Sequence, residues 1–422
     1  MKPALFRPSR NPGLYKRIAI AAVLGIAALC TFPRLASATS LPDAKITLGD
    51  EVFLQSSWRE LHGRCVGVIT NQTGVTSRLE PIVDAMKRNR QICVKAIYSP
   101  EHGLRGDRPA GSYVASYTDD RTGLPVYSLY GATRHPNAQM LAGVDVLLFD
   151  IQDVGDRAYT YISTMAYAME AARDSGKEIW ILDRPNPIGG MVEGPVLEPR
   201  FKSFIGLYPI AMRHGMTVGE LARLFNDHFG IKARLHVITM RGYRHDMLWP
   251  DTGLQWVQTS PNIPEWDTAI VYPGTGLIDN AGVNNGTGYT KPFKYAGAVG
   301  VDGPRLAATL NARNIPGVFF RPAYWTPMSG FWKEKQLSGV ELMVFNPRVF
   351  PSVRTAVEIL TAVRDTSPHA LAIKEQFLNN DWGTDALTKG LQGRASADAL
   401  VASWSSATRA FQSLRERYLL YP

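Results

Sequence analysis

Acidic, amide and cationic side chains follow four apolar segments in the first half of this 422-residue chain. Paired carboxyl groups are what glycoside hydrolysis uses as acid and as base or nucleophile. Arginine presents a planar fork that suits an acidic ligand. The residues concerned are Asn71 after 65–70; Glu101, His102 and Arg105 after 92–98; Asp150, Asp153, Arg157 and Tyr159 after 144–150; and Asp183 and Arg184 after 178–182.

Glu101 is the best candidate for a catalytic acid. It follows a strand-like segment and Pro100 and precedes His102 and Gly103, which predicts a tight turn. A carboxyl group in a partly apolar cleft can donate a proton to a leaving oxygen. The alternative is a carboxylate that only accepts backbone N–H groups of the turn. His102 either orients Glu101 or a substrate, or has a structural role.

A second acidic group lies at Asp150, Asp153 and Asp156. Glycoside hydrolysis needs a second carboxylate or help from the substrate itself, and any of the three could supply it. Asp183 is equally suited to an ion pair with Arg184 or Arg157.

Three arginines stand among these acids, namely Arg105, Arg157 and Arg184. Each could bind a substrate carboxylate or simply neutralise the aspartates. Tyr159 and Tyr161 could wall a sugar site, although packing in the core is an equal alternative.

The elements that must position these residues follow the pattern of a Rossmann-like α/β fold. Short apolar strands alternate with helices, which predicts a parallel sheet with helices on both faces. Ligands of such sheets bind beyond the carboxyl ends of the strands, where the polar residues fall. The predicted strands are 65–70, 92–98, 144–150, 178–182 and 235–240, and the helices are 78–90, 163–175 and 217–229.

The second half of the chain predicts a smaller C-terminal α/β domain. Prolines and tryptophans between 249 and 264 mark the change, so we place the boundary at 258 and the two domains at 39–258 and 259–422. A Gly/Asn-rich loop at 274–288 precedes helices near 302–313, 352–365 and 395–417.

Residues 1–38 predict a cleaved export signal, and therefore a periplasmic or secreted protein. Five basic residues precede the apolar run 18–32, which ends before Ala36-Ser37-Ala38. That run is short for a membrane span, although an uncleaved anchor is the alternative. Removing the six basic residues of 1–38 leaves a net charge of 9 − 6 = +3. The mature chain thus has no strong electrostatic case for nucleic acid and no predicted membrane span.

Two cysteines remain after the signal, Cys65 and Cys93, both in strand-like runs. They are either two small buried side chains or, if the strands are neighbours, a disulfide that export would permit. A zinc site is not indicated, and no phosphate loop, GxGxxG, HExxH or GxSxG motif occurs where it would form a site. We therefore predict neither a cofactor nor a metal.

Taken together, many ordered motifs resemble the exo-β-N-acetylmuramidase family NamZ, formerly a domain of unknown function. The resemblance covers about 58 to 415. The matching stretches are Gly67–Gly74, Ser99–Gly106, Gly123–Gly131, Asp150–Gly155, Arg157–Tyr161, Asp183–Gly190, Glu193–Pro195, Arg213–Thr217 and Ser260–Asn262.

This resemblance implies a Rossmann-like domain and a smaller C-terminal domain with a substrate cleft between them. It implies release of N-acetylmuramic acid from the non-reducing end of peptidoglycan fragments, such as muropeptides or a MurNAc-GlcNAc disaccharide. Glu101 would be the general acid, assisted by Asp150 or Asp153, and an arginine would receive the lactyl carboxylate. His214, within a matching stretch, joins the candidate substrate-binding residues.

One loop departs from the family pattern. Asp279 stands where a glutamate is usual, Asn285 replaces another acid, Thr287 replaces an arginine, and Lys291 keeps a positive charge. Three alternatives therefore stay open: a non-catalytic sugar-binding protein, a hydrolase of another acidic glycan, and a metal-dependent hydrolase using the aspartates and His102.

Overall fold

The computed structural model describes Leu41 and residues 43–422, which include both predicted domains. The predicted export signal at 1–38 lies outside the described residues. Among the residues that are described, none of the helices combines the length and apolar character needed to span a bilayer.

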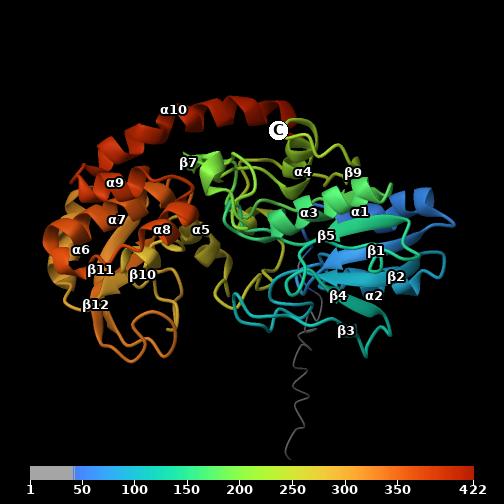
Figure 1. Ribbon diagram of the computed structural model, residues 1–422, viewed down its shortest axis with the longest axis horizontal. Helices are drawn as coiled ribbons and strands as arrows, with labels where there is room; N and C mark the ends of the chain where they lie inside the picture. Colours follow the sequence, from blue (N-terminus) through green and yellow to red (C-terminus); the bar gives the residue numbers. More distant parts are fainter. Residues whose placement is uncertain (1–40, 42) are drawn as a thin grey trace, which may run out of the picture. The chain divides into compact units, whose positions relative to one another are not determined.

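A seven-stranded sheet forms the centre of the N-terminal domain (Figure 1). Its strands run parallel except β3, which pairs antiparallel with β4 at one edge. In spatial order they are β3 (Tyr117–Thr118), β4 (Pro125–Ser128), β2 (Cys93–Ser99), β1 (Cys65–Thr70), β5 (Val146–Asp150), β6 (Glu178–Leu182) and β9 (Arg234–Ile238).

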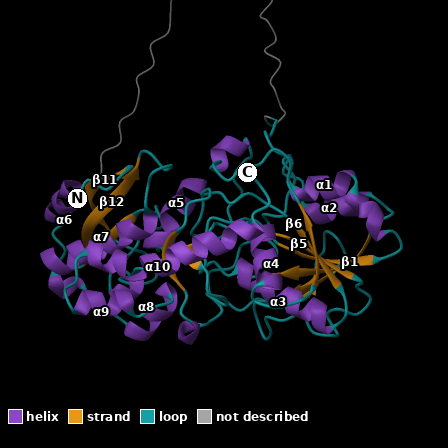
Figure 2. Cartoon of the chain, turned by 90° about the horizontal axis from the view of Figure 1, so that it is seen from above, coloured by secondary structure: helices purple, strands orange, loops and turns teal. Residues whose placement is uncertain are grey.

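Both faces of this sheet are buried, which explains why its central strands are continuously apolar. Along β5, Leu147 and Phe149 face one apolar cluster, whereas Val146 and Leu148 face another. The first cluster contains residues of α3 (Tyr161–Asp174) and α4 (Val218–Asp227), and the second contains residues of α1 (Gly49–Gln55) and α2 (Ile82–Arg88). Figure 2 shows the sheet between these two helix layers.

The fold class predicted from the sequence is confirmed, with strand and helix bounds within a few residues. A capping box begins α4, because the Thr217 hydroxyl accepts from the backbone N–H of Glu220 and the Glu220 carboxylate accepts from that of Thr217. Short strands β3 and β4, the hairpin β7 (Glu193–Val196) and β8 (Ala211–Arg213), and α1 were not predicted.

The C-terminal domain is built on a three-stranded antiparallel sheet in the order β10 (Tyr295–Ala298), β12 (Leu337–Val344), β11 (Val318–Trp325). The sequence predicted three of its helices and none of these strands. Helix α5 was missed because Pro273, which cannot donate to an i−4 carbonyl, lies within it. The helices are α5 (Trp266–Thr275), α6 (Gly303–Ala312), α7 (Ser352–Thr366), α8 (Glu375–Trp382), α9 (Ala386–Gln392) and α10 (Ala397–Arg415).

The end of the chain returns from the C-terminal domain to the N-terminal one (Figure 1). Helix α10 packs against β7, where the Thr408 hydroxyl donates to the Gly194 carbonyl at 2.8 Å. Beyond it, the Leu420 N–H donates to Glu220 at 2.7 Å and the Tyr421 hydroxyl donates to Asp183 at 2.6 Å. The described chain beyond residue 41 therefore forms one compact unit, and the boundary at 258 stays a prediction.

Cys65 and Cys93 begin two neighbouring strands and form a disulfide. They face each other in the register of β1 and β2, and the bond closes 28 residues of chain. Of the two alternatives left open by the sequence, the structure has the disulfide.

Replacing both cysteines by alanine should lower the free energy of unfolding by about 3.5 kcal/mol, the chain-entropy value for a loop of 28 residues. Urea unfolding of both proteins, with and without dithiothreitol, measures this. The wild type should become as unstable as the variant when reduced, and the variant should not respond to reductant. Equal stability of the two oxidised proteins would contradict the prediction.

Candidate active site

The strand order places a topological switch point between β1 and β5. The chain proceeds from β1 to β2 and β4 on one side and then returns to β5 on the other side. In open α/β sheets, ligands bind beyond the carboxyl ends of the strands at such a point. The polar residues predicted as a site therefore fall at the edge where a ligand is expected.

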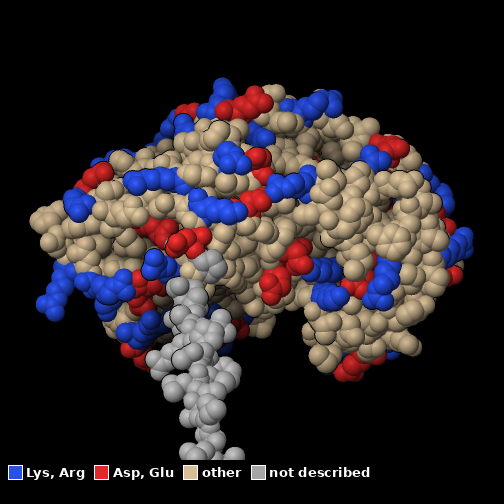
Figure 3. Space-filling view, turned by 180° about the vertical axis from the view of Figure 1, so that it is seen from behind, with Lys and Arg blue, Asp and Glu red and all other residues tan. Residues whose placement is uncertain are grey.

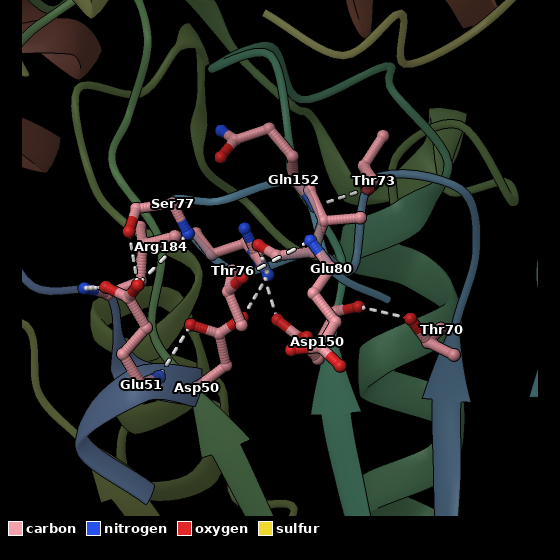
Figure 4. Close-up of polar contacts among 12 residues, drawn as sticks. Asp50, Glu51, Thr70, Thr73, Thr76, Ser77, Glu80, Asp150, Gln152 and Arg184 are labelled. Atoms are coloured by element: carbon pink, nitrogen blue, oxygen red, sulfur yellow. Dashed lines mark hydrogen bonds and ion pairs between the residues drawn. The ribbon is translucent and has the colours of Figure 1, made fainter. Parts of the chain in front are cut away.

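Arg184 lies in a buried ion-pair network at this edge. Its Nε donates to Asp150 at 2.5 Å and its Nη2 donates to Asp50 at 2.9 Å and to the Val75 carbonyl at 2.9 Å (Figure 4). Burial lowers the pKa of Arg184, but the charges of Asp150 and Asp50 outweigh it and raise the pKa above its usual range. Arg184 and Asp150 therefore form a buried ion pair.

Asp183 is also fully engaged. It accepts from the backbone N–H groups of Arg184 and Gly219 and from the hydroxyls of Thr217 and Tyr421, at 2.6 to 3.0 Å. Burial raises the pKa of Asp183 to about 7, followed by the charge of Glu220. These contacts join β6, the start of α4 and the chain end, so Asp183 has a structural role in the described chain.

Glu101 is 7% exposed and is held at both carboxylate oxygens. Its Oε1 accepts from the Gly111 N–H at 2.9 Å, and its Oε2 accepts from the Thr160 hydroxyl at 2.7 Å. His102 and Gly103 adopt positive φ angles of 69° and 77°, which form the predicted turn beside it. The carboxyl group is therefore fixed in one orientation at the end of β2.

Tyr159 and Tyr161, which follow β5, both bind Thr259. The Tyr159 hydroxyl donates to the Thr259 hydroxyl at 2.9 Å and Tyr161 donates to the Thr259 carbonyl at 2.5 Å. Burial raises the pKa of Tyr161 well above its usual value, and the negative charges of Glu101 and Asp153 add to this. The charges of both carboxylates therefore act on the same phenol.

Asp153 keeps one free carboxylate oxygen. Its Oδ2 accepts from the Gly155 N–H at 2.7 Å and lies 3.7 Å from His214 Nε2. Among the described residues, Asp153 Oδ1 and His214 Nε2 are buried without a hydrogen-bond partner, as are Asn71 Nδ2 and Gln152 Oε1. Buried polar atoms are usually satisfied, so this group of atoms is where ligand groups or water are expected.

The remaining candidates at the β1 and β2 ends make local contacts. Asn71 Oδ1 accepts from the backbone and hydroxyl of Thr73 at 2.9 and 2.6 Å. His102 Nδ1 donates to the Arg108 carbonyl at 2.8 Å, and Arg105 pairs with Asp119 at 2.5 Å. None of these three contacts Glu101 or Asp153 through a hydrogen bond in the described chain.

Arg157 links the two domains. It is 1% exposed, and its guanidinium donates to the carbonyls of Pro195 at 3.0 Å and Asp381 at 2.9 Å. Burial lowers the pKa of Arg157 to about 10, although the charges of Asp156 and Asp381 oppose the shift. This position is suited to fixing the C-terminal domain against the sheet edge.

Several residues at the site were missed by reasoning from the sequence. Thr160 binds Glu101 directly but stands between two tyrosines that drew attention for their aromatic rings. Tyr272 lies across from Tyr159, with ring centroids 5.7 Å apart, and comes from α5. Tyr130 and Thr160 lie within stretches that resemble the family motifs, which was the only signal for them in the sequence. Nothing in their spacing indicates that they lie near Glu101.

Two residues of the loop that departs from the family pattern, Asn285 and Lys291, make polar contacts within the C-terminal domain. Asn285 is 1% exposed, donates to the Gly276 carbonyl at 3.3 Å and accepts from the Thr287 N–H at 3.2 Å. Lys291 pairs with Glu341. Both side chains therefore contact other residues of the C-terminal domain.

Two cavities bear on where a ligand could bind. One of about 300 Å³ lies at the carboxyl ends of β1 and β2 and is lined in part by Asn71 and Arg105, but not by Glu101. A larger one of about 770 Å³ lies between α5 and β12 in the C-terminal domain. We place the site at the sheet edge because none of the candidate catalytic or substrate-binding residues lines the larger cavity, although Lys291 of the departing loop does.

Charge and metal ligands add little to the site. Within residues 43–422, no group of three His, Cys, Asp or Glu side chains could hold a metal ion. Basic and acidic side chains are interspersed on the face seen in Figure 3, without a large area of one sign.

Comparison with known families identifies the protein's relatives. Residues 66–267 match "Exo-beta-N-acetylmuramidase NamZ, N-terminal" and residues 270–421 match "Exo-beta-N-acetylmuramidase NamZ, C-terminal". The chain belongs to the NamZ family. The resemblance read from the motifs is thereby confirmed, and the chain belongs to a family of glycosidases.

Relatives with known names or structures match nearly the whole chain. The peptidoglycan β-N-acetylmuramidase NamZ of Bacillus subtilis is 41% identical over 93% of this chain and 97% of its own length. Two crystal structures of DUF1343 family proteins from Bacteroides fragilis share the two-domain fold. One is 37% identical with a TM-score of 0.85 over 90% of this chain and 100% of its own, and the other 28% identical with 0.73 over 89% and 99%.

Asp156 is a buried carboxyl group beside the site of this NamZ-family chain. Its Oδ1 accepts from the Ala158 N–H at 2.6 Å, and its Oδ2 has no hydrogen-bond partner among the described residues. Burial raises its pKa to about 7, with the Arg157 charge and the Ala158 N–H opposing the shift.

Asp156→Asn should change how stability depends on pH. The folded-state pKa of about 7 lies above the ordinary value of 3.8, so the folded protein holds this proton more tightly than the unfolded chain. The linked stability, on the order of 4 kcal/mol, is fully present below pH 3.8 and is lost as the pH rises through 7.

The variant removes this loss, so its Tm minus that of the wild type should become more positive between about pH 5 and about pH 8. Asp120→Asn, at an exposed position, serves as the control and should follow the wild type. A constant Tm difference for Asp156→Asn across that range would contradict the prediction.

Proposed function

We propose that this protein is an exo-acting β-N-acetylmuramidase that releases N-acetylmuramic acid from the non-reducing end of peptidoglycan fragments, with Glu101 as general acid. The observation that carries the proposal is the orientation of Glu101, held by Thr160 and Gly111 at the carboxyl end of β2 beside the switch point. The named activity of the Bacillus subtilis relative supports the substrate class.

The second group of the reaction is best supplied by Asp153. Each of these aspartates has one carboxylate oxygen without a hydrogen-bond partner among the described residues, but Asp150 is paired with the Arg184 guanidinium. Asp153 instead lies beside His214, and its charge, like that of Glu101, acts on the Tyr161 phenol. It would act on the anomeric carbon or on the attacking water while Glu101 protonates the leaving oxygen. The 2-acetamido group of the sugar is the other source of this assistance.

We also infer that the protein acts after export, in the periplasm or outside the cell. The predicted signal at 1–38 and the disulfide between Cys65 and Cys93 support this, because structural disulfides persist in oxidising compartments. A disaccharide or muropeptide released from the cell wall would be met there.

Glu101→Gln should lower kcat on a MurNAc-GlcNAc disaccharide by about 10²- to 10⁴-fold, the usual contribution of general acid catalysis. The amide keeps the size of the side chain but cannot donate the required proton. Released N-acetylmuramic acid, quantified by chromatography, measures the rate, and binding of the disaccharide should be retained. Glu60→Gln, at an exposed position before β1, is the matched control and should keep the full rate.

Four outcomes would contradict this assignment in different ways. Full activity of Glu101→Gln would remove Glu101 from the reaction. Binding of the disaccharide without turnover by the wild type would favour a sugar-binding protein whose altered 279–287 loop has lost catalysis. Neither binding nor turnover would indicate that another acidic glycan is the substrate, and loss of turnover with a chelator would indicate a metal.

The two aspartates should separate into one catalytic and one structural residue. Asp153→Asn should lower kcat by about 10²-fold or more with an unchanged Tm. Asp150→Asn should destabilise the fold by about 3 kcal/mol, because it leaves part of the buried Arg184 charge without its partner. Steady-state kinetics and thermal unfolding of both variants test this. Loss of kcat at constant Tm in Asp150→Asn alone would contradict the assignment.

A further inference from the structure

A muramic acid residue carries a lactyl carboxylate that glucosamine lacks, so an enzyme that selects it needs a positive charge near the acid. The three arginines indicated by the sequence are all engaged in the described chain. Arg184 binds two carboxylates, Arg157 binds two backbone carbonyls, and Arg105 pairs with Asp119. The cation must therefore come from elsewhere.

Arg134 is an exposed cation held on aromatic rings. Its Cζ lies 4.0 Å from the ring centroid of Phe204 and 5.4 Å from that of Tyr130. Unlike Arg105, it makes no ion pair with any carboxylate of the described chain. Stacking of this kind orients a guanidinium while leaving its N–H edge available for a carboxylate.

The aromatic support of Arg134 is itself ordered. Phe204 packs on Tyr130 with ring centroids 5.9 Å apart and stacks on Tyr167 at 5.8 Å. Tyr130 follows β4 and Tyr167 belongs to α3, so the rings connect the guanidinium to two elements of the sheet domain. Packing against these rings therefore restricts the position of the Arg134 side chain, although that side chain is exposed.

Tyr130 lies near the strand end that carries Glu101, because β4 pairs in parallel with β2 up to Ser128 and Ser99, two residues before Tyr130 and Glu101. Burial raises the pKa of the Tyr130 phenol, the charge of Glu101 raises it further, and Arg134 lowers it. The Arg134 guanidinium, which lies over the Tyr130 ring, is therefore placed beside the end of β2. A cation placed one side chain away from the acid fits a pyranose whose scissile bond is at C1 and whose lactyl ether is at O3.

We propose that Arg134 binds the lactyl carboxylate of the substrate and determines selectivity for muramic acid over glucosamine. This inference rests on the proposed muramidase function and adds to it the residue that reads the acidic group. A bidentate pair between guanidinium and carboxylate is the strong form of such a contact. Arg134 is a specificity-determining residue, whereas Glu101 remains the proton donor.

The test compares three 4-nitrophenyl β-glycosides: N-acetylmuramic acid, its lactyl methyl ester, and N-acetylglucosamine. For the acid, Arg134→Gln should raise KM by about 10- to 100-fold with kcat within a factor of about three, since a charged hydrogen bond is lost from binding. The preference of the wild type for acid over ester should fall toward one in the variant. Arg134→Lys should retain part of it.

Arg59→Ala is the matched control. Arg59 is also exposed and stacks on an aromatic ring, with its Cζ 5.0 Å from the Trp58 centroid, but it lies in the 3₁₀ turn Ser57–Leu61 before β1. Its kinetic constants should equal those of the wild type. The Tm of every variant should stay at the wild-type value, because neither arginine is buried.

The outcomes separate this inference from the proposed function. Turnover by the wild type with an unchanged preference for the acid in Arg134→Gln overturns the role of Arg134 and leaves the muramidase function intact. If no glycoside is turned over, calorimetric binding of free N-acetylmuramic acid decides. Binding that Arg134→Gln weakens supports Arg134 although the hydrolase proposal fails, and binding that is absent or unchanged overturns both.

Discussion

Arg184 carries a full positive charge into the interior of the N-terminal domain, and the carboxyl edge of the sheet is organised around neutralising it. An unpaired charge at such a depth costs several kcal/mol, so its partners must be in place whenever the chain is folded. Those partners come from α1, from the end of β5 and from the loop after β1. The network ties an N-terminal helix to the centre of the sheet and at the same time pairs one carboxylate oxygen of Asp150 with a cation.

The number of hydrogen-bond partners also distinguishes the other aspartates at this edge. Asp183 accepts four hydrogen bonds, whereas Asp153 Oδ1 lacks a hydrogen-bond partner among the described residues, as does the His214 Nε2 that lies 3.7 Å from Asp153 Oδ2. Residue type alone cannot make this distinction, because both are aspartates at strand ends. The difference arises from which backbone N–H groups and hydroxyls the fold brings within reach of each carboxylate.

The sequence predicted the sheet, its helices and the edge that bears the site, because apolar periodicity and turn residues are local signals. It also singled out Glu101 from its place on a turn after β2. It did not indicate Thr160, Tyr130 or Arg134, since their relation to Glu101 depends on chain segments 29 to 59 residues apart in sequence meeting at one edge. The C-terminal strands were missed as well, and Pro273 concealed α5 although packing on α7 sustains that helix.

The C-terminal domain contributes to this edge through buried polar contacts as well as apolar packing. Arg157 donates to the Asp381 carbonyl, Tyr272 packs on Tyr159, and Tyr421 donates to Asp183. Separating the domains would break each of these contacts, so they stabilise the two domains against each other. Selectivity between two sugars that differ by one lactyl group requires acid and cation to be held at a fixed separation. A sheet edge fastened from both domains, with Arg134 stacked on Tyr130, fits that requirement of the proposed selectivity.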